Sequence, residues 1–172
     1  IDRRRDLPAF ASETLVDWFE GRGGAAVPVE EAERTAVLYP DTATNYVDVE
    51  RGKAAVRALE ALGVHLRIPE VSGSGRPPLS QGMIASATAK AEDVYAGLVT
   101  HVDAGRDVVV IEPSDLAMFR SEYERLLPES SFERLADASY DVMEYLFGLI
   151  ENGGDPAALR APAAGTGPVA SG

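Results

Sequence analysis

The sequence contains no cysteine. This absence excludes disulfide bonds, thiolate nucleophiles, and thiolate ligands for zinc or iron–sulfur clusters within the chain as it stands. Histidine is scarce as well, because His65 and His101 are the only two in 172 residues. Two imidazoles cannot build a multi-histidine metal site, so we expect no metal in this chain. We interpret both histidines as exposed structural residues.

Long apolar runs are also missing. No run reaches the length of about 18 residues needed to cross a bilayer, and no secretory signal segment opens the chain. Basic residues are outnumbered, with 16 Lys and Arg against 28 Asp and Glu and a net charge of −12. Such a surface repels nucleic-acid phosphates and anionic lipids, so we expect no nucleic-acid partner and no direct membrane insertion. The composition is halophile-like, and we expect a cytoplasmic location.

Apolar residues make up 45% of the chain, which is enough for one buried core. We expect an N-terminal linker and amphipathic helix over residues 1–30, with the helix at about 11–20 and Ser12 as its N-cap. An α/β domain is expected over 31–152. A flexible linker or tail is expected over 153–172, where large apolar residues are rare. Because the first residue is Ile1 rather than Met, we also expect a piece of a longer protein.

Strand and helix patterns alternate along the central part of the chain. Buried strands are predicted at 35–39, 64–68 and 107–111, and helices at 52–63, 80–104, 114–127 and 131–150. In the second strand, His65 and Arg67 alternate with apolar residues, which is typical of a half-covered or edge strand. Strand–helix units in this order predict a three-layer α/β domain of the Rossmann/flavodoxin-like class, with a small, mostly parallel sheet.

Ligands of open parallel sheets collect outside the carboxyl ends of the strands. That rule selects the loops 40–46, 71–82 and 112–115. The polar side chains at their tips could converge on one crevice: Asp41, Thr42, Asn45, Ser74, Arg76, Ser114 and Asp115. The simpler alternative is structural, because Asp, Ser, Thr and Asn before helices are ordinary N-caps. Arg76 could likewise pair with Glu112 or Asp115.

The stretch G-S-G-R-P-P at 73–78 invites comparison with phosphate-binding loops. No G-K-[ST] follows it, and Pro78 stands where a dinucleotide fingerprint has its third glycine. A second hypothesis nevertheless remains open, in which the crevice binds a nucleotide or other small anion through Arg76 and helix N-termini. Ser114 lacks the G-x-S-x-G turn of a hydrolase nucleophile. Asp41, Glu112 and Asp115 could supply oxygen ligands to Mg²⁺ or Ca²⁺.

The motifs P-D-T-A-T-N-Y, G-K-A-A-V-R-A-L-E-A-L-G-V, G-S-G-R-P-P-L-S-Q-G and V-V-V-I-E-P-S-D occur in this order. Together they resemble the cysteine-rich CCG domain of iron–sulfur and FAD-linked oxidoreductases, including anaerobic glycerol-3-phosphate dehydrogenase, glycolate oxidase and heterodisulfide reductase. The resemblance covers about residues 1–152. The segment I-D-R-R-R-D-L-P-A-F is similar to the join between a ferredoxin-type domain and the first such repeat.

This chain departs from the family at every cluster ligand. The family reads P-D-C-x-x-N-Y, G-C-C-G-R-P and E-P-S-C, and its cysteines hold iron–sulfur centres. Here Thr42 stands at the first cysteine, Gly73 and Ser74 at the C-C pair, and Asp115 at the last. The remaining loop residues match the family: Asp41, Asn45, Tyr46, Gly75, Arg76, Pro77, Glu112, Pro113 and Ser114. The resemblance therefore implies a degenerate first repeat without a cofactor of its own.

The resemblance also implies a function. We expect a non-catalytic scaffold repeat of a larger enzyme that contains FAD and iron–sulfur clusters and oxidises a 2-hydroxy acid, such as lactate or glycolate, or glycerol 3-phosphate. Electrons would pass to a quinone or another acceptor, and the parent complex would hold the domain at the inner face of the membrane. The expected partners are a second CCG repeat and a ferredoxin-type domain. A free-standing interaction module is a third possibility.

Overall fold

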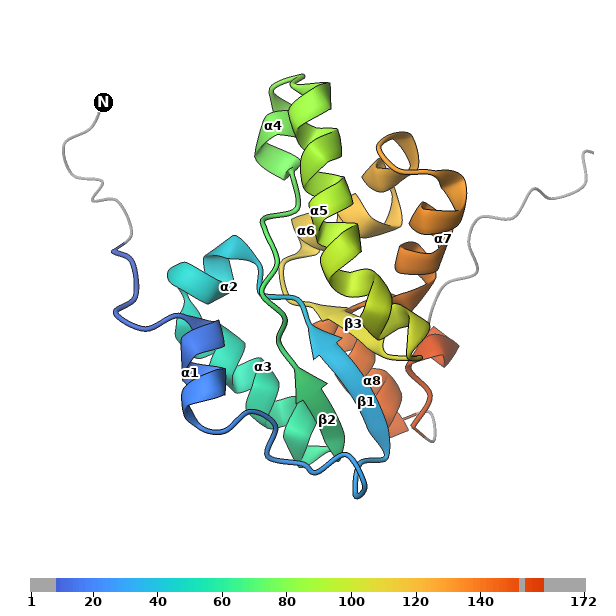
Figure 1. The fold of residues 1–172 in the computed structure, drawn as a ribbon. Helices are drawn as coiled ribbons and strands as arrows, with labels where there is room; N and C mark the ends of the chain where they lie inside the picture. The colour runs from blue at the N-terminus through green and yellow to red at the C-terminus, as the bar shows by residue number, and fades with distance from the viewer. Residues whose placement is uncertain (1–8, 152–153, 160–172) are drawn as a thin grey trace, which may run out of the picture.

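The computed structural model describes residues 9–151 and 154–159 of the chain. Four strands form one all-parallel sheet in the order β2-β1-β3-β4. The strands are β1 (Arg34–Leu38), β2 (Val64–Arg67), β3 (Asp107–Val110) and β4 (Ser139–Asp141). Helices cover both faces of the sheet (Figure 1), which confirms the predicted three-layer α/β architecture.

Each face of the sheet has its own set of helices. The first face packs against α1 (Leu15–Gly21), α3 (Val49–Ala61) and α8 (Val142–Glu151). The second face packs against α5 (Ile84–Asp103), α6 (Pro113–Arg120) and α7 (Glu129–Ala138). Shorter elements connect them: α2 (Thr42–Tyr46), α4 (Arg76–Ser80) and the 3-10 helices η1 (Glu122–Arg125) and η2 (Pro156–Leu159).

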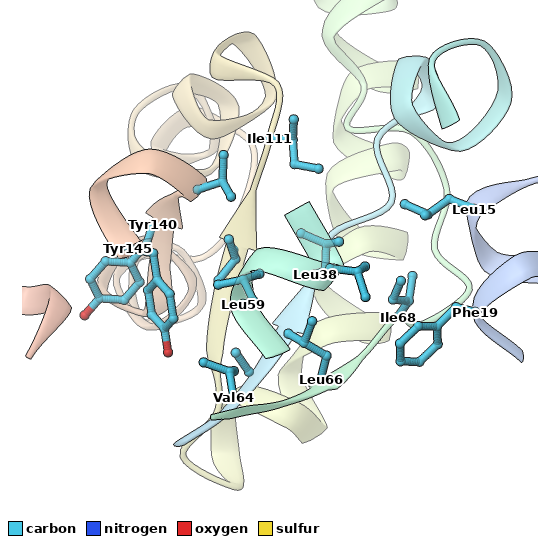
Figure 2. Close-up of a cluster of buried hydrophobic side chains, with 14 of the residues drawn as sticks. Leu15, Phe19, Leu38, Leu59, Val64, Leu66, Ile68, Ile111, Tyr140 and Tyr145 are labelled. Carbon is cyan, nitrogen blue, oxygen red and sulfur yellow. The ribbon is translucent and has the colours of Figure 1, made fainter. Parts of the chain in front are cut away.

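The two central strands are apolar on both faces, as strands buried between two helical layers must be. In β1, Leu38 belongs to the cluster under α3, whereas Val37 belongs to the cluster under α5. In β3, Val109 and Val108 are divided in the same way. Figure 2 shows the first cluster, which contains Leu38 of β1, Ile111 directly after β3, and side chains of the neighbouring helices. The continuous apolar runs of the sequence are explained by this arrangement.

The half-covered strand predicted at 64–68 lies at the edge of the sheet. β2 pairs only with β1 among the described strands, and its Val64 and Leu66 are buried in the first cluster. The alternate residues His65 and Arg67 are half-buried and exposed, respectively. The alternating pattern therefore identified the edge position correctly.

The prediction of a single helix over 131–150 is wrong. The chain leaves α7 at Ala138, forms β4 over Ser139–Asp141 beside β3, and begins α8 at Val142. The strand is only three residues long, and the apolar spacing on both sides of it is helical, so periodicity alone conceals it. A local signal was present, because Asp141 and Glu144 exchange backbone and side-chain hydrogen bonds as a capping box does.

Other boundaries also differ from the expectations. The helix predicted over 80–104 is α5, which begins at Ile84, after Gly82 with a φ of 74° that suits glycine. The short helix α4 lies before it, within the stretch 71–82 that was predicted as a loop. The helix predicted over 114–127 is divided into α6 and η1. Thr14, rather than Ser12, caps α1 through a reciprocal pair with Asp17.

The predicted tail is folded over its first described part. Arg34 Nε donates a hydrogen bond to the Gly154 carbonyl oxygen at 2.6 Å. Pro156 packs so tightly on Gly148 that a Cβ added to Gly148 would lie 2.5 Å from Pro156 Cα. The folded unit therefore extends past residue 153, and residues 160–172 lie outside the described part. Within the described ranges, no helix is both long and apolar enough to cross a membrane.

Candidate functional site

The loops that follow β1, β2 and β3 meet in one cleft at the carboxyl ends of the strands. In the sheet, β1 lies between β2 on one side and β3 on the other (Figure 1). The order in which strands are added to the sheet therefore reverses beside β1, and α/β proteins bind ligands at such a point. The cleft has a volume of about 740 Å³. Most of the predicted site residues line it, namely Asp41, Thr42, Gly73, Ser74, Gly75, Arg76, Ser114 and Asp115.

Two predicted residues do not line this cleft. Asn45 and Tyr46 line a neighbouring hollow beside α1 instead. The Asn45 side-chain oxygen accepts a hydrogen bond from the Val16 backbone N–H at 3.1 Å, so it holds α1 against α2. Tyr46 is 44% exposed. Asn45 thus has a structural role that joins two helices.

Asp41 is a buried helix cap. Its side chain is fully buried and accepts hydrogen bonds from the Thr44 backbone N–H at 2.9 Å and from the Thr44 hydroxyl. The carboxylate therefore neutralises the amino end of α2, which is otherwise the place where an anion would bind.

Glu112 closes the amino end of α6 in the same way. Its carboxylate accepts from the Ser114 backbone N–H at 3.4 Å and from the Ser114 hydroxyl at 3.1 Å, and Pro113 occupies the first helical position. The N-cap interpretation holds for this helix, with Glu112 rather than Ser114 as the capping side chain. The hypothesis of an anion at free helix N-termini is weakened for α2 and α6, because each of these two termini already has a carboxylate cap.

Ser74 and Asp115 join the second loop to the third. The Ser74 hydroxyl donates a hydrogen bond to Asp115 Oδ1, and Ser74 is only 3% exposed. Burial raises the pKa of Asp115, and the carboxylates of Asp41 and Glu112 raise it further, while the Ser74 hydrogen bond and Arg76 lower it. The net direction of the shift is upward.

An aromatic wall behind the cleft holds the second loop in place. The Tyr39 hydroxyl donates to the Ser72 carbonyl at 3.1 Å, and the Tyr123 hydroxyl donates to the Ser74 carbonyl at 2.8 Å. Phe119 lies between the two phenols, with ring centroids 4.9 Å from Tyr39 and 5.4 Å from Tyr123. Burial is the main cause that raises the pKa of both tyrosines, so both remain hydrogen-bond donors. Sequence reasoning missed this support, because the three rings come from separate parts of the chain: Tyr39 directly follows β1, Phe119 lies on α6 and Tyr123 lies on η1.

The loop geometry does not favour a phosphate cradle. Gly75 has a φ of 86°, and a Cβ there would lie 3.0 Å from Lys90 Cβ and 3.1 Å from the Ala87 carbonyl oxygen. The glycine therefore allows close packing against α5. The Arg76 N–H points to Ser74 Oγ at 3.4 Å, and Pro77 and Pro78 have no N–H. A phosphate loop needs a series of free backbone N–H groups at this place.

Two cations occupy the cleft, and sequence reasoning identified only one of them. Arg76 and Lys90 both line it and are exposed. Neither forms an ion pair with the described residues, so the alternative in which Arg76 pairs with Glu112 or Asp115 is not observed there. A signal for Lys90 exists, because it is one of only two lysines and the stretch 71–91 contains no acidic residue.

The carboxylates of the cleft do not make a metal site. Asp41, Glu112 and Asp115 all line it, but no group of three or more His, Asp or Glu residues in the described part is arranged to hold a metal ion. The alternative of a Mg²⁺ or Ca²⁺ site therefore receives no support. Each of these carboxylates accepts a hydrogen bond within the chain, from Thr44, Ser114 and Ser74 respectively.

The two histidines are far apart in sequence but share a separate hollow of about 570 Å³ beside β2. His65 Nδ1 lies 2.8 Å from the Val27 carbonyl oxygen, which attaches the loop before β1 to the edge strand. Burial lowers the pKa of His101, and the nearby cations Arg106 and Arg67 lower it further. Both histidines are half-buried rather than exposed.

A scan against protein-family models finds no match, and searches of curated proteins and of solved structures find none either. The assignment of a function therefore depends on the cleft itself.

Proposed function

We propose that this chain is a non-catalytic scaffold and docking domain of a larger oxidoreductase that contains FAD and iron–sulfur clusters. The parent enzyme would be an FAD-linked dehydrogenase of a 2-hydroxy acid, such as lactate or glycolate, or of glycerol 3-phosphate. It would pass electrons to a quinone or another acceptor. The observation that carries the proposal is the position of the four residues that the CCG resemblance aligns with cluster cysteines.

Those four residues come together in space although they come from three loops. All of them line the cleft: Thr42, Gly73, Ser74 and Asp115. A Cβ added to Gly73 would lie 3.3 Å from Thr42 Oγ1, and Ser74 is hydrogen-bonded to Asp115. Thiolates that share one cluster must converge in this manner.

The residues now present do not fit an iron–sulfur cluster, because hydroxyl groups, a glycine and a carboxylate replace the thiolates that such a cluster needs. Ser74 and Asp115 instead bond to each other, which closes the floor of the cleft. We therefore assign no chemical step to this domain, and the flavin and clusters belong to other parts of the parent protein.

An exposed apolar surface on α8 supports the docking role. Met143, Phe147 and Ile150 lie three and four residues apart on α8, and they are 67%, 53% and 62% exposed. Large apolar side chains that gather on one helix face are typical of an interaction surface. The proposed partners are a second CCG repeat and a ferredoxin-type domain, in a cytoplasmic complex at the inner face of the membrane.

Restoring the cysteines tests the proposal. The variant T42C/G73C/S74C/D115C and the wild type would be incubated anaerobically with iron and sulfide. We expect bound iron and sulfide with visible charge-transfer absorbance in the variant, and a colourless wild type. The matched control is a variant with four cysteines at exposed positions outside the cleft: S12C, T100C, S121C and S130C.

Two results would contradict the proposal. The first is a stoichiometric cluster in the wild type. The second is a cleft-cysteine variant that folds, as judged by circular dichroism, but binds no more iron than the control variant. The coding sequence on both sides provides an independent check. We expect a flavin domain with C-x-x-C-x-x-C motifs upstream and an intact C-C-G repeat downstream, whereas a gene no longer than this chain would favour a free-standing module.

A further inference from the structure

The charged groups that line the cleft differ in their availability. Its three acidic residues are already engaged by hydrogen-bond donors of the chain: Asp41 by Thr44, Glu112 by Ser114 and Asp115 by Ser74. The basic residues Arg76 and Lys90 are exposed and have no ion-pair partner within the described ranges. A charged ligand would thus meet two cations without an ion-pair partner among the described residues and three carboxylates that already accept hydrogen bonds.

Arg76 and Lys90 are held on the same side of the cleft. Lys90 lies on α5, and its Cβ would be 3.0 Å from a Cβ added to Gly75, the residue directly before Arg76. Tyr123 and Asp115 fix the backbone and side chain of Ser74. The loop that carries Arg76 is therefore anchored beside Lys90, and its guanidinium adds a planar fork suited to a carboxylate.

The apolar residues that line the cleft indicate what the uncharged part of a ligand would be. Pro77, Pro78 and Met83 provide an apolar surface next to the two cations, and Met83 is 52% exposed. The volume of about 740 Å³ lies in the range of about 300–1,000 Å³ that is usual for small-molecule pockets. A ligand with an apolar body and a charged head matches these two kinds of surface.

The nature of the charged head follows from the same contacts. A polyphosphate needs several free backbone N–H groups, whereas Asp41 and Glu112 cap α2 and α6, and two prolines occupy the first turn of α4. Among the described helices that begin at the cleft, α5 has an N-terminus with neither a side-chain cap nor a proline in its first turn. A dianion would also be repelled more strongly than a monoanion by the three carboxylates of the lining. A single carboxylate is the head that these surroundings tolerate best.

We propose that this cleft binds a small organic monocarboxylate, with its head held by Arg76 and Lys90 and its apolar body against Pro77, Pro78 and Met83. This proposal is independent of the scaffold function, because it depends only on groups now present in the cleft.

Isothermal titration calorimetry of the full chain tests the proposal with a matched pair of probes, phenylbutyrate and the uncharged phenylbutyramide. We expect saturable one-to-one binding of phenylbutyrate and at least about tenfold weaker binding of the amide. R76Q and K90Q should each weaken phenylbutyrate binding by about threefold to tenfold. The control R125Q removes an exposed arginine outside the cleft and should leave the affinity unchanged.

Inorganic phosphate and adenosine monophosphate separate the alternatives. We expect both to bind more weakly than phenylbutyrate. The proposal is overturned if phenylbutyrate shows no saturable binding, if its amide binds equally well, or if R76Q/K90Q binds phenylbutyrate as the wild type does. Tighter binding of adenosine monophosphate than of phenylbutyrate would also overturn it and would favour a nucleotide site. Circular dichroism of each variant verifies that a loss of binding does not come from unfolding.

Discussion

Tyr123→Phe tests whether the aromatic wall holds the cleft loop in place. The hydroxyl of Tyr123 donates to the Ser74 carbonyl oxygen at 2.8 Å. Tyr123 is 0% exposed and Ser74 is 3% exposed, so water has little access to replace the lost donor. The substitution removes one oxygen atom and retains the ring, which keeps the contact with Phe119.

The expected loss of stability follows from these facts. A typical hydrogen bond contributes about 0.5–1.5 kcal/mol net, and a buried acceptor left without a donor costs about 1–3 kcal/mol. We therefore expect the free energy of unfolding to fall by about 2 kcal/mol. For a chain of this size that corresponds to a decrease in Tm of about 4–8 °C.

Tyr39→Phe is the matched control, because its hydroxyl donates to the Ser72 carbonyl at 3.1 Å and Ser72 is half-buried. Its expected cost is about 1 kcal/mol or less, since solvent can reach the acceptor more easily. Urea denaturation gives both free energies, and amide hydrogen exchange at residues 73–76 measures whether the loop opens locally. The reasoning is refuted if Tyr123→Phe is as stable as the wild type, or if Tyr39→Phe is the more destabilising change.

Two further predictions concern Asp115 and a helix contact. Because burial raises the pKa of Asp115 in the folded state, stability falls as pH rises from the ordinary aspartate value through the folded value. Asp115→Asn, whose carbonyl can still accept from Ser74, should be more stable than the wild type at neutral pH, with no difference at low pH. Denaturation across a pH series checks this, and a variant less stable at neutral pH would contradict it. Gly52→Ala should destabilise the fold by about 1–3 kcal/mol despite the better helix propensity of alanine, because the added Cβ would lie 2.5 Å from Leu15 Cδ2. Thermal unfolding measures the loss, and Gly21→Ala, which meets nothing within 4 Å, should not show it.

Sequence patterns predicted the helices and strands in which buried apolar residues recur at a regular spacing. β1 and β3 are continuous apolar runs because helices cover both of their faces, and β2 alternates because it is an edge strand. β4 was missed because three residues carry no usable period, and the strand is defined by its pairing with β3, which is distant in sequence. The fold of Gly154–Leu159 was missed for a similar reason, since contacts with Arg34 and Gly148 hold a segment that is poor in large apolar residues.

The position of the cleft was predicted from the sequence, but the hydrogen bonds among its side chains were not. The rule for parallel sheets located the three loops, because strand direction alone decides where they meet. Which of their polar groups are available depends on hydrogen bonds that no local pattern contains. Asp41 and Glu112 cap helices within their own loops, whereas Ser74 reaches Asp115 across 41 residues of sequence.

The sequence by itself determined that thiolate chemistry is impossible in this chain, that its core is divided by a parallel sheet, and that three loops lie at one end of the sheet. These conclusions follow from composition and from short-range periodicity. Only the tertiary structure decided that the carboxylates of the cleft accept hydrogen bonds from the chain and that Lys90 lines the same cleft as Arg76. It also decided that two tyrosine hydroxyls donate to backbone carbonyls of the second loop. Such pairings depend on which side chains the packed helices bring within a few ångströms, and that is a property of the whole fold.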